Sequence, residues 1–309
     1  MNRRILISIV VGFVALASAA YGKTFGAWGT PVNAESVAGA SSELNTPYND
    51  GCPIQSPDGL SLYIASNRPG GLGGQDIWVA HRDEPSGPYG APVNLGAPVN
   101  SAADDFCPSP TRGRRLFFVS ARSGGCGGPD IYVTRLDLDG WRDPQNLGCA
   151  INSAAGEASP SLFIDDASHS VLYFSSTRPG GFEAGGTDSD IYLSVEFGPA
   201  QLAPELNTAN EDTRPNVRKD GLEVVFDSTR AGGLSALPDI WTATRATDTA
   251  DWSTPVHLDA PINTVASETR ASLSWNGLTM VFGSTRPGSE LAPDGVTISN
   301  DVYVVTRGA

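Results

Sequence analysis

Positive charge is scarce in this sequence. Lysine and arginine together number 20 against 34 aspartates and glutamates, which gives a formal net charge of −14. An acidic surface repels nucleic acid and anionic lipid, so we expect no nucleic-acid partner. Charged residues make up only 17% of the chain, whereas it has 35 glycines and 23 prolines. This composition is typical of many short strands and tight turns, and it disfavours long helices.

Long apolar runs are also missing, except at the N-terminus. The run from residue 5 to residue 20 follows Arg3 and Arg4, and Ala17-Ser18-Ala19 offers a cleavage site. The pattern predicts a signal peptide over residues 1–22. The alternative is an uncleaved anchor, but the run is shorter than the roughly 20 residues that span a bilayer. We therefore expect a periplasmic or secreted protein with no membrane span after signal removal.

Familiar catalytic and metal-binding motifs are absent. The sequence contains no G-x-S-x-G for a nucleophilic serine, no H-E-x-x-H for zinc and no Cys-x-x-Cys. We expect no catalytic residue, no metal and no cofactor. The four cysteines fit an oxidising compartment and favour disulfides over a zinc site.

A repeated stretch dominates the rest of the chain. "SNRPGGLGGQDIWVAHR" (66–82) resembles a phosphate-binding loop, but that motif occurs once and leads into a helix. Here the stretch has four relatives, each followed by a short β-rich segment, so we interpret it as a hairpin connection. An arginine marks each copy at intervals of 52 to 56 residues: Arg68, Arg122, Arg178, Arg230 and Arg286. An aspartate precedes the aromatic residue in each copy: Asp76, Asp130, Asp190, Asp239 and Asp301.

Each repeat contains the pattern of four short strands, which is the unit of a propeller blade. Asp58-Gly59 and its equivalents mark a hairpin between the first two strands, and a proline-containing crossover holds the fourth. The last repeat lacks its fourth strand, and residues 25–46 carry the matching pattern. The sequence therefore predicts an all-β, five-bladed propeller over residues 23–309, closed by an N-terminal strand. The expected blades are about 49–100, 101–153, 154–208, 209–264, and 265–309 with 25–46.

The motifs "SPDG", "S-x-R-P-G-G" and "DI[WY]" resemble the TolB-like, WD40-like propeller repeats of bacterial envelope proteins. The resemblance covers nearly all of the chain after residue 22 and implies a partner in an envelope assembly. TolB-type propellers typically have six blades, whereas five are counted here, so the resemblance is specific for the repeat and weak for the function.

Carboxylates recur just before the first strand of each blade. They are Asp50, Asp105, Glu157, Asp212 and Glu268. One interpretation is an acidic ring at the mouth of the channel that binds a cation or a basic peptide. The alternative is structural, with each carboxylate capping a strand or pairing with the arginine of its own repeat. For the repeated aspartates, we expect a structural role as acceptors of backbone N–H groups in the glycine-rich turns.

The repeat positions also order the cysteines. Cys52 and Cys107 occupy equivalent places in adjacent blades, while Cys126 and Cys149 lie in a loop and the crossover of the second blade. All four map to one face of the ring. We predict the disulfides Cys52–Cys107 and Cys126–Cys149.

Two classes of function remain. The first is a non-catalytic binding scaffold in the cell envelope, a monomer that contacts an envelope or extracellular protein and possibly a glycan. The alternative is a carbohydrate-active enzyme with carboxylates at the channel mouth, since five-bladed propellers also host glycosidases. Two carboxyl groups about 5–10 Å apart in a deep pocket would favour the enzyme. We expect the scaffold, because the candidate carboxylates are equivalent in every repeat.

Overall fold

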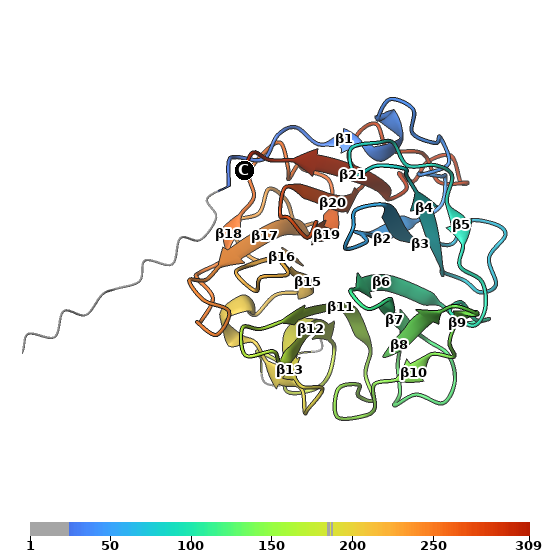
Figure 1. Ribbon diagram of the computed structural model, residues 1–309. Helices are drawn as coiled ribbons and strands as arrows, with labels where there is room; N and C mark the ends of the chain where they lie inside the picture. The colour runs from blue at the N-terminus through green and yellow to red at the C-terminus, as the bar shows by residue number, and fades with distance from the viewer. Residues whose placement is uncertain (1–24, 184–185, 187) are drawn as a thin grey trace, which may run out of the picture.

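The computed structural model describes residues 25–183, 186 and 188–309, so the predicted signal peptide lies outside the described residues. Within them the chain is all-β. Five antiparallel sheets, each with four main strands, stand around a central axis (Figure 1). This five-bladed propeller confirms the fold class predicted from the repeats. No helix in the described part of the chain is long and apolar enough to cross a bilayer.

Each blade runs from an inner first strand to an outer fourth strand. Blade 1 contains β2 (Asp50–Gln55), β3 (Ser61–Ser66), β4 (Asp76–His81) and β5 (Val93–Asn94). Blade 2 contains β6 (Asp105–Thr111), β7 (Arg115–Ser120), β8 (Asp130–Asp137) and β10 (Gln145–Asn146), and β9 (Gly140–Trp141) pairs with the end of β8.

Blades 3 and 4 repeat this order. Blade 3 contains β11 (Glu157–Ile164), β12 (Ser170–Ser176), β13 (Asp190–Val195) and β14 (Gln201–Leu202), followed by the 3-10 turn η2 (Pro204–Leu206). Blade 4 contains β15 (Asp212–Val217), β16 (Glu223–Ser228), β17 (Asp239–Thr244) and β18 (Val256–His257).

Blade 5 takes strands from both ends of the described chain. It contains β19 (Glu268–Leu273), β20 (Thr279–Ser284), β21 (Asp301–Thr306) and, outermost, β1 (Val32–Asn33), which precedes the 3-10 turn η1 (Ala34–Ser36). β1 pairs antiparallel with β21, and Trp28 forms a further bridge with Arg307. This pairing covers the outer edge of β21, which would otherwise be an open strand edge.

The glycine pair in each repeat has two structural causes, seen clearly in blade 2. Gly124 has a φ of 92°, a region that other residues rarely adopt. Gly125 lies against the Asp130 carboxylate, and a Cβ at this position would overlap the Oδ2 atom. That oxygen accepts a hydrogen bond from the backbone N–H of Cys126 at 2.5 Å. The same close approach to the repeated aspartate occurs at Gly71, Gly181 and Gly233.

Buried side chains of the second strands contribute to the core of every blade. One equivalent position is completely buried in all five: Ile64, Phe118, Phe174, Phe226 and Phe282. Complete burial of one such side chain stabilises a fold by about 1.5–3 kcal/mol. Hydrogen bonds between blades add to this at the inner strands, as where the Ser272 hydroxyl donates to the Pro53 carbonyl at 2.7 Å.

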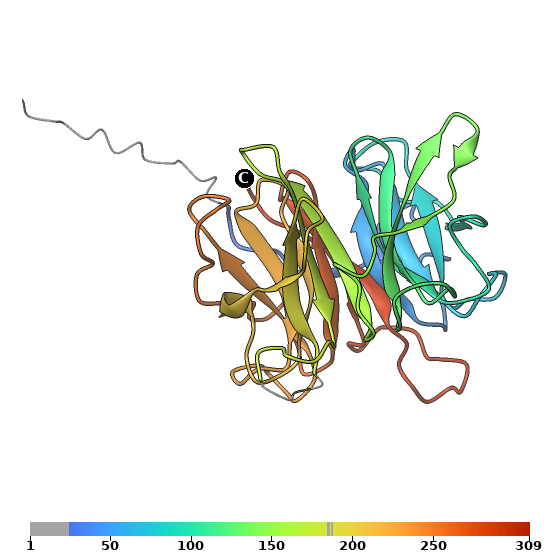
Figure 2. The ribbon, with the colours of Figure 1, turned by 90° about the horizontal axis from the view of Figure 1, so that it is seen from below.

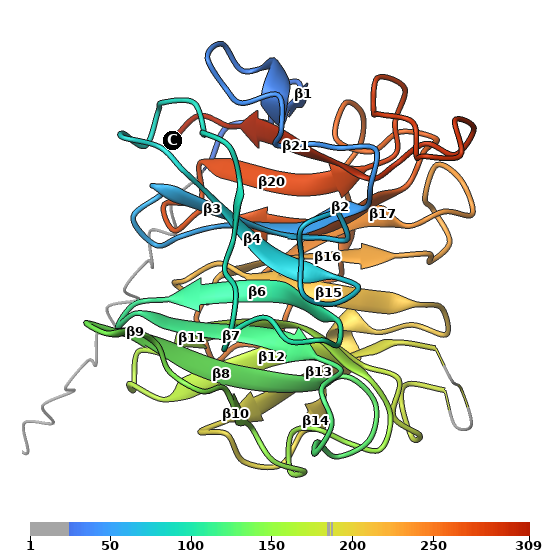
Figure 3. The same cartoon turned by 90° about the vertical axis from the view of Figure 1, so that its right-hand side faces the viewer.

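The strand directions define two faces. The top face carries the loops between second and third strands and the crossovers into the next blade, and the bottom face carries the turns between first and second strands. In the edge-on views, the loop from β20 to β21 extends from one face and the β8–β9 hairpin from the opposite face (Figures 2 and 3).

Candidate functional site at the propeller axis

The five carboxylates of the predicted acidic ring are buried in ion pairs. Each is at most 1% exposed and pairs with the arginine of its own repeat. Asp50 lies 2.5 Å from Arg68 and Asp105 lies 2.8 Å from Arg122. The other pairs are Glu157–Arg178, Asp212–Arg230 and Glu268–Arg286. Burial raises the pKa of the Asp50 carboxyl, and Arg68 acts in the opposite direction.

Further contacts hold these ion pairs inside the top loops. Each carboxylate accepts the backbone N–H of the residue four positions earlier, for example Thr46 to Asp50 at 2.6 Å. Each arginine also lies over aromatic rings of its own blade, as where Arg178 sits 4.8 Å from the Tyr192 ring centre. The structural alternative considered for these carboxylates is therefore present in every blade. Their role as a binding ring stays a prediction.

The repeated aspartates meet the glycine-rich turns. In each blade the Oδ2 atom accepts a backbone N–H of the turn, given by Leu72, Cys126, Phe182, Leu234 or Glu290. In blades 1, 2 and 5 an asparagine of the fourth strand adds a side-chain N–H, as Asn146 does to Asp130 at 2.8 Å. In blade 4 His257 takes that place, 2.9 Å from Asp239.

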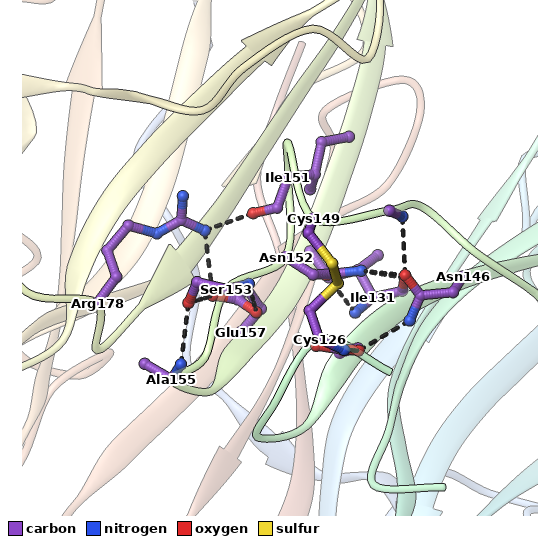
Figure 4. Close-up of a disulfide and its surroundings, with 12 residues drawn as sticks. Cys126, Ile131, Asn146, Cys149, Ile151, Asn152, Ser153, Ala155, Glu157 and Arg178 are labelled. Carbon is purple, nitrogen blue, oxygen red and sulfur yellow. Dashed lines mark hydrogen bonds and ion pairs between the residues drawn. A yellow bond between two sulfur atoms is a disulfide. The ribbon is translucent and has the colours of Figure 1, made fainter. Parts of the chain in front are cut away.

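Both predicted disulfides are present. Cys126–Cys149 links a top loop of blade 2 to the crossover that leaves the same blade, beside Asn146 and Asn152 (Figure 4). Cys52–Cys107 joins the inner strands of blades 1 and 2. Disulfides persist in oxidising compartments, so they indicate a secreted or otherwise exported protein.

The Cys52–Cys107 bridge also lines a small cavity on the propeller axis, with a volume of about 30 Å³. We call it the axial cavity. The residue two positions after each ring carboxylate contributes to its wall, and we call this place in the repeat the axial position. Its five occupants are Cys52, Cys107, Ser159, Arg214 and Arg270. None of the ring carboxylates is among the residues that line this cavity.

The axial position has the same backbone geometry in all five blades. Its φ angles are positive, at 48°, 46°, 50°, 56° and 57° in blade order, and the first-strand pairing slips at a bulge there. Residues with side chains adopt this region at a cost of order 1–3 kcal/mol. The bulge brings side chains from five blades to one place on the axis.

Blades 4 and 5 fill the axial position with charge. Arg214 Nη1 lies 2.9 Å from Asp227 Oδ2, and Asp227 is fully buried. The backbone N–H of Arg270 donates to both Asp227 oxygens, at 2.8 and 2.9 Å. Burial raises the pKa of the Asp227 carboxyl, and Arg214 opposes this shift. Burial and, to a smaller extent, the charge of Arg214 lower the pKa of Arg270 to about 10.

Blade 1 leaves room for this charge. Gly51 lies so close to the Arg270 guanidinium that a Cβ there would be 2.8 Å from Nη1. Asn300 lies beside both residues and donates its side-chain N–H to the Asp50 carbonyl at 2.7 Å. The other blades have phenylalanine, alanine or threonine at the position of Gly51.

A tryptophan spans the bottom of the channel. Trp275, in the first turn of blade 5, has Arg112 of blade 2 over its ring at 4.5 Å and Lys219 of blade 4 at 5.7 Å. Lys219 also donates to the Leu162 carbonyl of blade 3 at 2.6 Å. Four blades therefore meet below the axial cavity, which leaves the top face as the approach for a ligand.

Sequence reasoning missed Arg214, Arg270 and Asp227. A signal was available, because aligning the repeats on their carboxylates gives Cys, Cys, Ser, Arg and Arg at the axial position. Asp227 likewise stands where the other blades have Ala65, Val119, Ser175 and Gly283. Residues that break a repeat in a wall shared by all blades point to function more directly than residues present in every copy.

No protein-family model matches the chain, and no curated protein matches it in sequence. Several solved structures share its fold. An α-L-arabinofuranosidase from Lactobacillus brevis has a TM-score of 0.55 at 15% identity, with 89% of this chain and 94% of that one covered. The catalytic domain of the Coprinopsis cinerea GH62 α-L-arabinofuranosidase has a TM-score of 0.52 at 12% identity, with 92% and 97% covered.

TolB from Acinetobacter baumannii has a TM-score of 0.46 at 16% identity, with 83% of this chain and 53% of that chain covered. The TolB-like resemblance is thus shown only as far as a propeller fold that other families share. The comparisons contradict the prediction of a non-catalytic envelope scaffold, because arabinofuranosidases and related glycoside hydrolases are prominent among the similar structures. They favour the carbohydrate-active alternative, and the likeness itself shows the propeller fold.

Proposed function

We propose that this chain is a carbohydrate-active propeller, periplasmic or fully exported, which receives a glycan at the top mouth of its channel. One observation carries the assignment: Arg214, Arg270 and Asp227 break the repeat at the axial cavity. A propeller fold alone does not define an activity, because one fold hosts many functions. A polar cluster confined to two blades is the kind of local site in which function resides.

The fold likeness to arabinofuranosidases supports carbohydrate as the ligand class. The axial cavity offers what a sugar needs, since planar guanidinium groups donate hydrogen bonds in a fixed fork. Prolines in the same wall, including Pro53, Pro108 and Pro160, add apolar surface. We assign Arg214 and Arg270 to glycan recognition and Asp227 to positioning them.

Hydrolysis sets a further requirement. Glycosidases use two carboxyl groups about 5–10 Å apart. No aspartate or glutamate is among the described residues that line the axial cavity. Binding and hydrolysis therefore need separate measurements.

The test is a polysaccharide panel containing arabinan, arabinoxylan, glucuronoxylan and pectin. Affinity electrophoresis would measure binding, and release of reducing ends would measure hydrolysis. We expect at least one polysaccharide to be bound or cleaved. Arg270→Gln should weaken that interaction about tenfold, since a hydrogen bond to a charged group contributes about 1.5–3 kcal/mol.

The matched control is Arg135→Gln, because Arg135 lies on β8 of blade 2 with its side chain 61% exposed. This variant should behave like the wild-type chain. A correctly folded wild-type chain that neither binds nor cleaves any member of the panel would overturn the proposed function.

A further inference from the structure

The charges around the axial cavity identify a ligand class more narrowly, on the premise that the proposed function holds. We propose that Arg214 and Arg270 bind the carboxylate of a single uronic acid residue in an otherwise neutral glycan. Three features carry this inference: the charge count, the space beside Arg270 and the charge of the whole chain.

The charge count leaves one cation without a counter-ion. Asp227 forms its ion pair with Arg214 and contacts Arg270 through the backbone N–H. The Nε atom of Arg270 is buried and has no hydrogen-bond partner among the described residues. A buried donor without an acceptor is costly, and a carboxylate oxygen would satisfy it.

The space beside Arg270 is produced by glycines. Gly51 allows the guanidinium to lie close to the backbone of blade 1, and Gly283 allows Asn300 to fill the neighbouring place. A Cβ at Gly283 would lie 2.5 Å from Asn300 Nδ2. Because equivalent positions in the other blades carry larger residues, this arrangement is specific to the contact between blades 5 and 1.

Size and valence favour a carboxylate. The axial cavity has a volume of about 30 Å³, room for a small polar group and not for a whole sugar ring. Two arginines and one aspartate leave one net positive charge, which matches a carboxylate better than a doubly charged phosphate. The planar guanidinium fork also matches the two oxygens of a carboxylate.

The charge of the whole chain limits how acidic the ligand can be. With a formal net charge of −14, the surface repels a polymer that carries a carboxylate on every residue. Screening limits this repulsion to about 8 Å at physiological salt, so an isolated carboxylate reaches the cavity more easily than a polyuronate. The expected ligand is therefore a neutral glycan with one uronate at its end or as a side group.

The experiment measures binding by calorimetry with three ligands. The first is a disaccharide of one glucuronate and one neutral sugar, the second is the same disaccharide with its carboxyl group reduced to an alcohol, and the third is polygalacturonate. The acidic disaccharide should bind at least about tenfold more tightly than its reduced form, as expected for charge-assisted hydrogen bonds. This preference should shrink as salt is raised and disappear in Arg270→Gln.

Two variants serve as controls. Arg270→Lys keeps the charge but loses the fork, so it should retain only part of the preference. Arg135→Gln should retain all of it. Circular dichroism and thermal unfolding would establish that each variant is folded.

The outcomes separate the two proposals. Equal binding of the acidic and reduced disaccharides, or tighter binding of polygalacturonate, would overturn the uronate inference and leave the proposed function intact. A peptide with a free C-terminal carboxylate that binds more tightly than any sugar, and more tightly than its amidated form, would overturn both. A preference for the acidic disaccharide that survives in Arg270→Gln would place the carboxylate elsewhere and refute the axial site.

Discussion

Blades 1 and 2 and blades 4 and 5 use one backbone position in opposite ways. At the axial position the first pair carries Cys52 and Cys107, joined in a disulfide, and the second pair carries Arg214 and Arg270. All four residues have a positive φ and line the same cavity. In one half the position stabilises the ring covalently. In the other half it places two like charges side by side, which costs stability and creates a site.

The disulfide half should show the largest effect on stability. Replacing both Cys52 and Cys107 by alanine removes a cross-link between residues 55 apart, whereas Cys126–Cys149 spans 23. The loop-entropy model gives losses of about 4 and about 3 kcal/mol for the two bridges. Urea unfolding of the two double variants would measure both values. A larger loss for Cys126–Cys149 would show that chain entropy is not what the axial bridge contributes.

The arginine half depends on Asp227. Asp227→Asn keeps the shape of the side chain but leaves Arg214 without its counter-charge, so we expect a loss of about 2–3 kcal/mol. The matched control is Ser175→Ala at the equivalent position of blade 3, where a hydroxyl accepts from Thr213 at 3.1 Å. That substitution should cost no more than about 1.5 kcal/mol. Similar losses for the two variants would mean that the ion pair adds nothing beyond an ordinary hydrogen bond.

The sequence is enough to predict what repeats. Arg68 and its equivalents define the blade count, and the matching places of Cys52 and Cys107 predict their pairing because adjacent blades bring equivalent residues together. The buried ion pairs depend on the loops that fold over them. Asp50 is covered by the segment that contains Thr46, and no local pattern distinguishes such a carboxylate from an exposed one.

The axial site was beyond reach for a related reason. Arg214 and Arg270 stand in "DTRPN" and "ETRAS", which read as ordinary polar strand starts. Only the bulge turns them toward the axis, and only Gly51, more than 200 residues away in the chain, makes room for Arg270. Contacts between distant residues of different blades decide this site, so the repeat pattern alone does not reveal it.

The smallest effect, and the one with the opposite sign, should come from Arg270→Gln. Folding lowers the pKa of this guanidinium from 12.5 to about 10, so the folded chain holds the charge at a cost at every pH below about 10. Removing the charge should therefore stabilise the fold at pH 7, by about 1 kcal/mol, while weakening glycan binding.

Glutamine meets the same φ of 57° and keeps the backbone N–H that Asp227 accepts, so strain and that hydrogen bond cancel in the comparison. The gain should shrink as the pH rises past 10, because the wild-type arginine then loses its proton in the folded state. Thermal unfolding from pH 7 to pH 10.5 would follow this trend. A loss of stability like that of the cysteine variants would mean that Arg270 supports the ring as the disulfide does, and the contrast between the two halves would then fail.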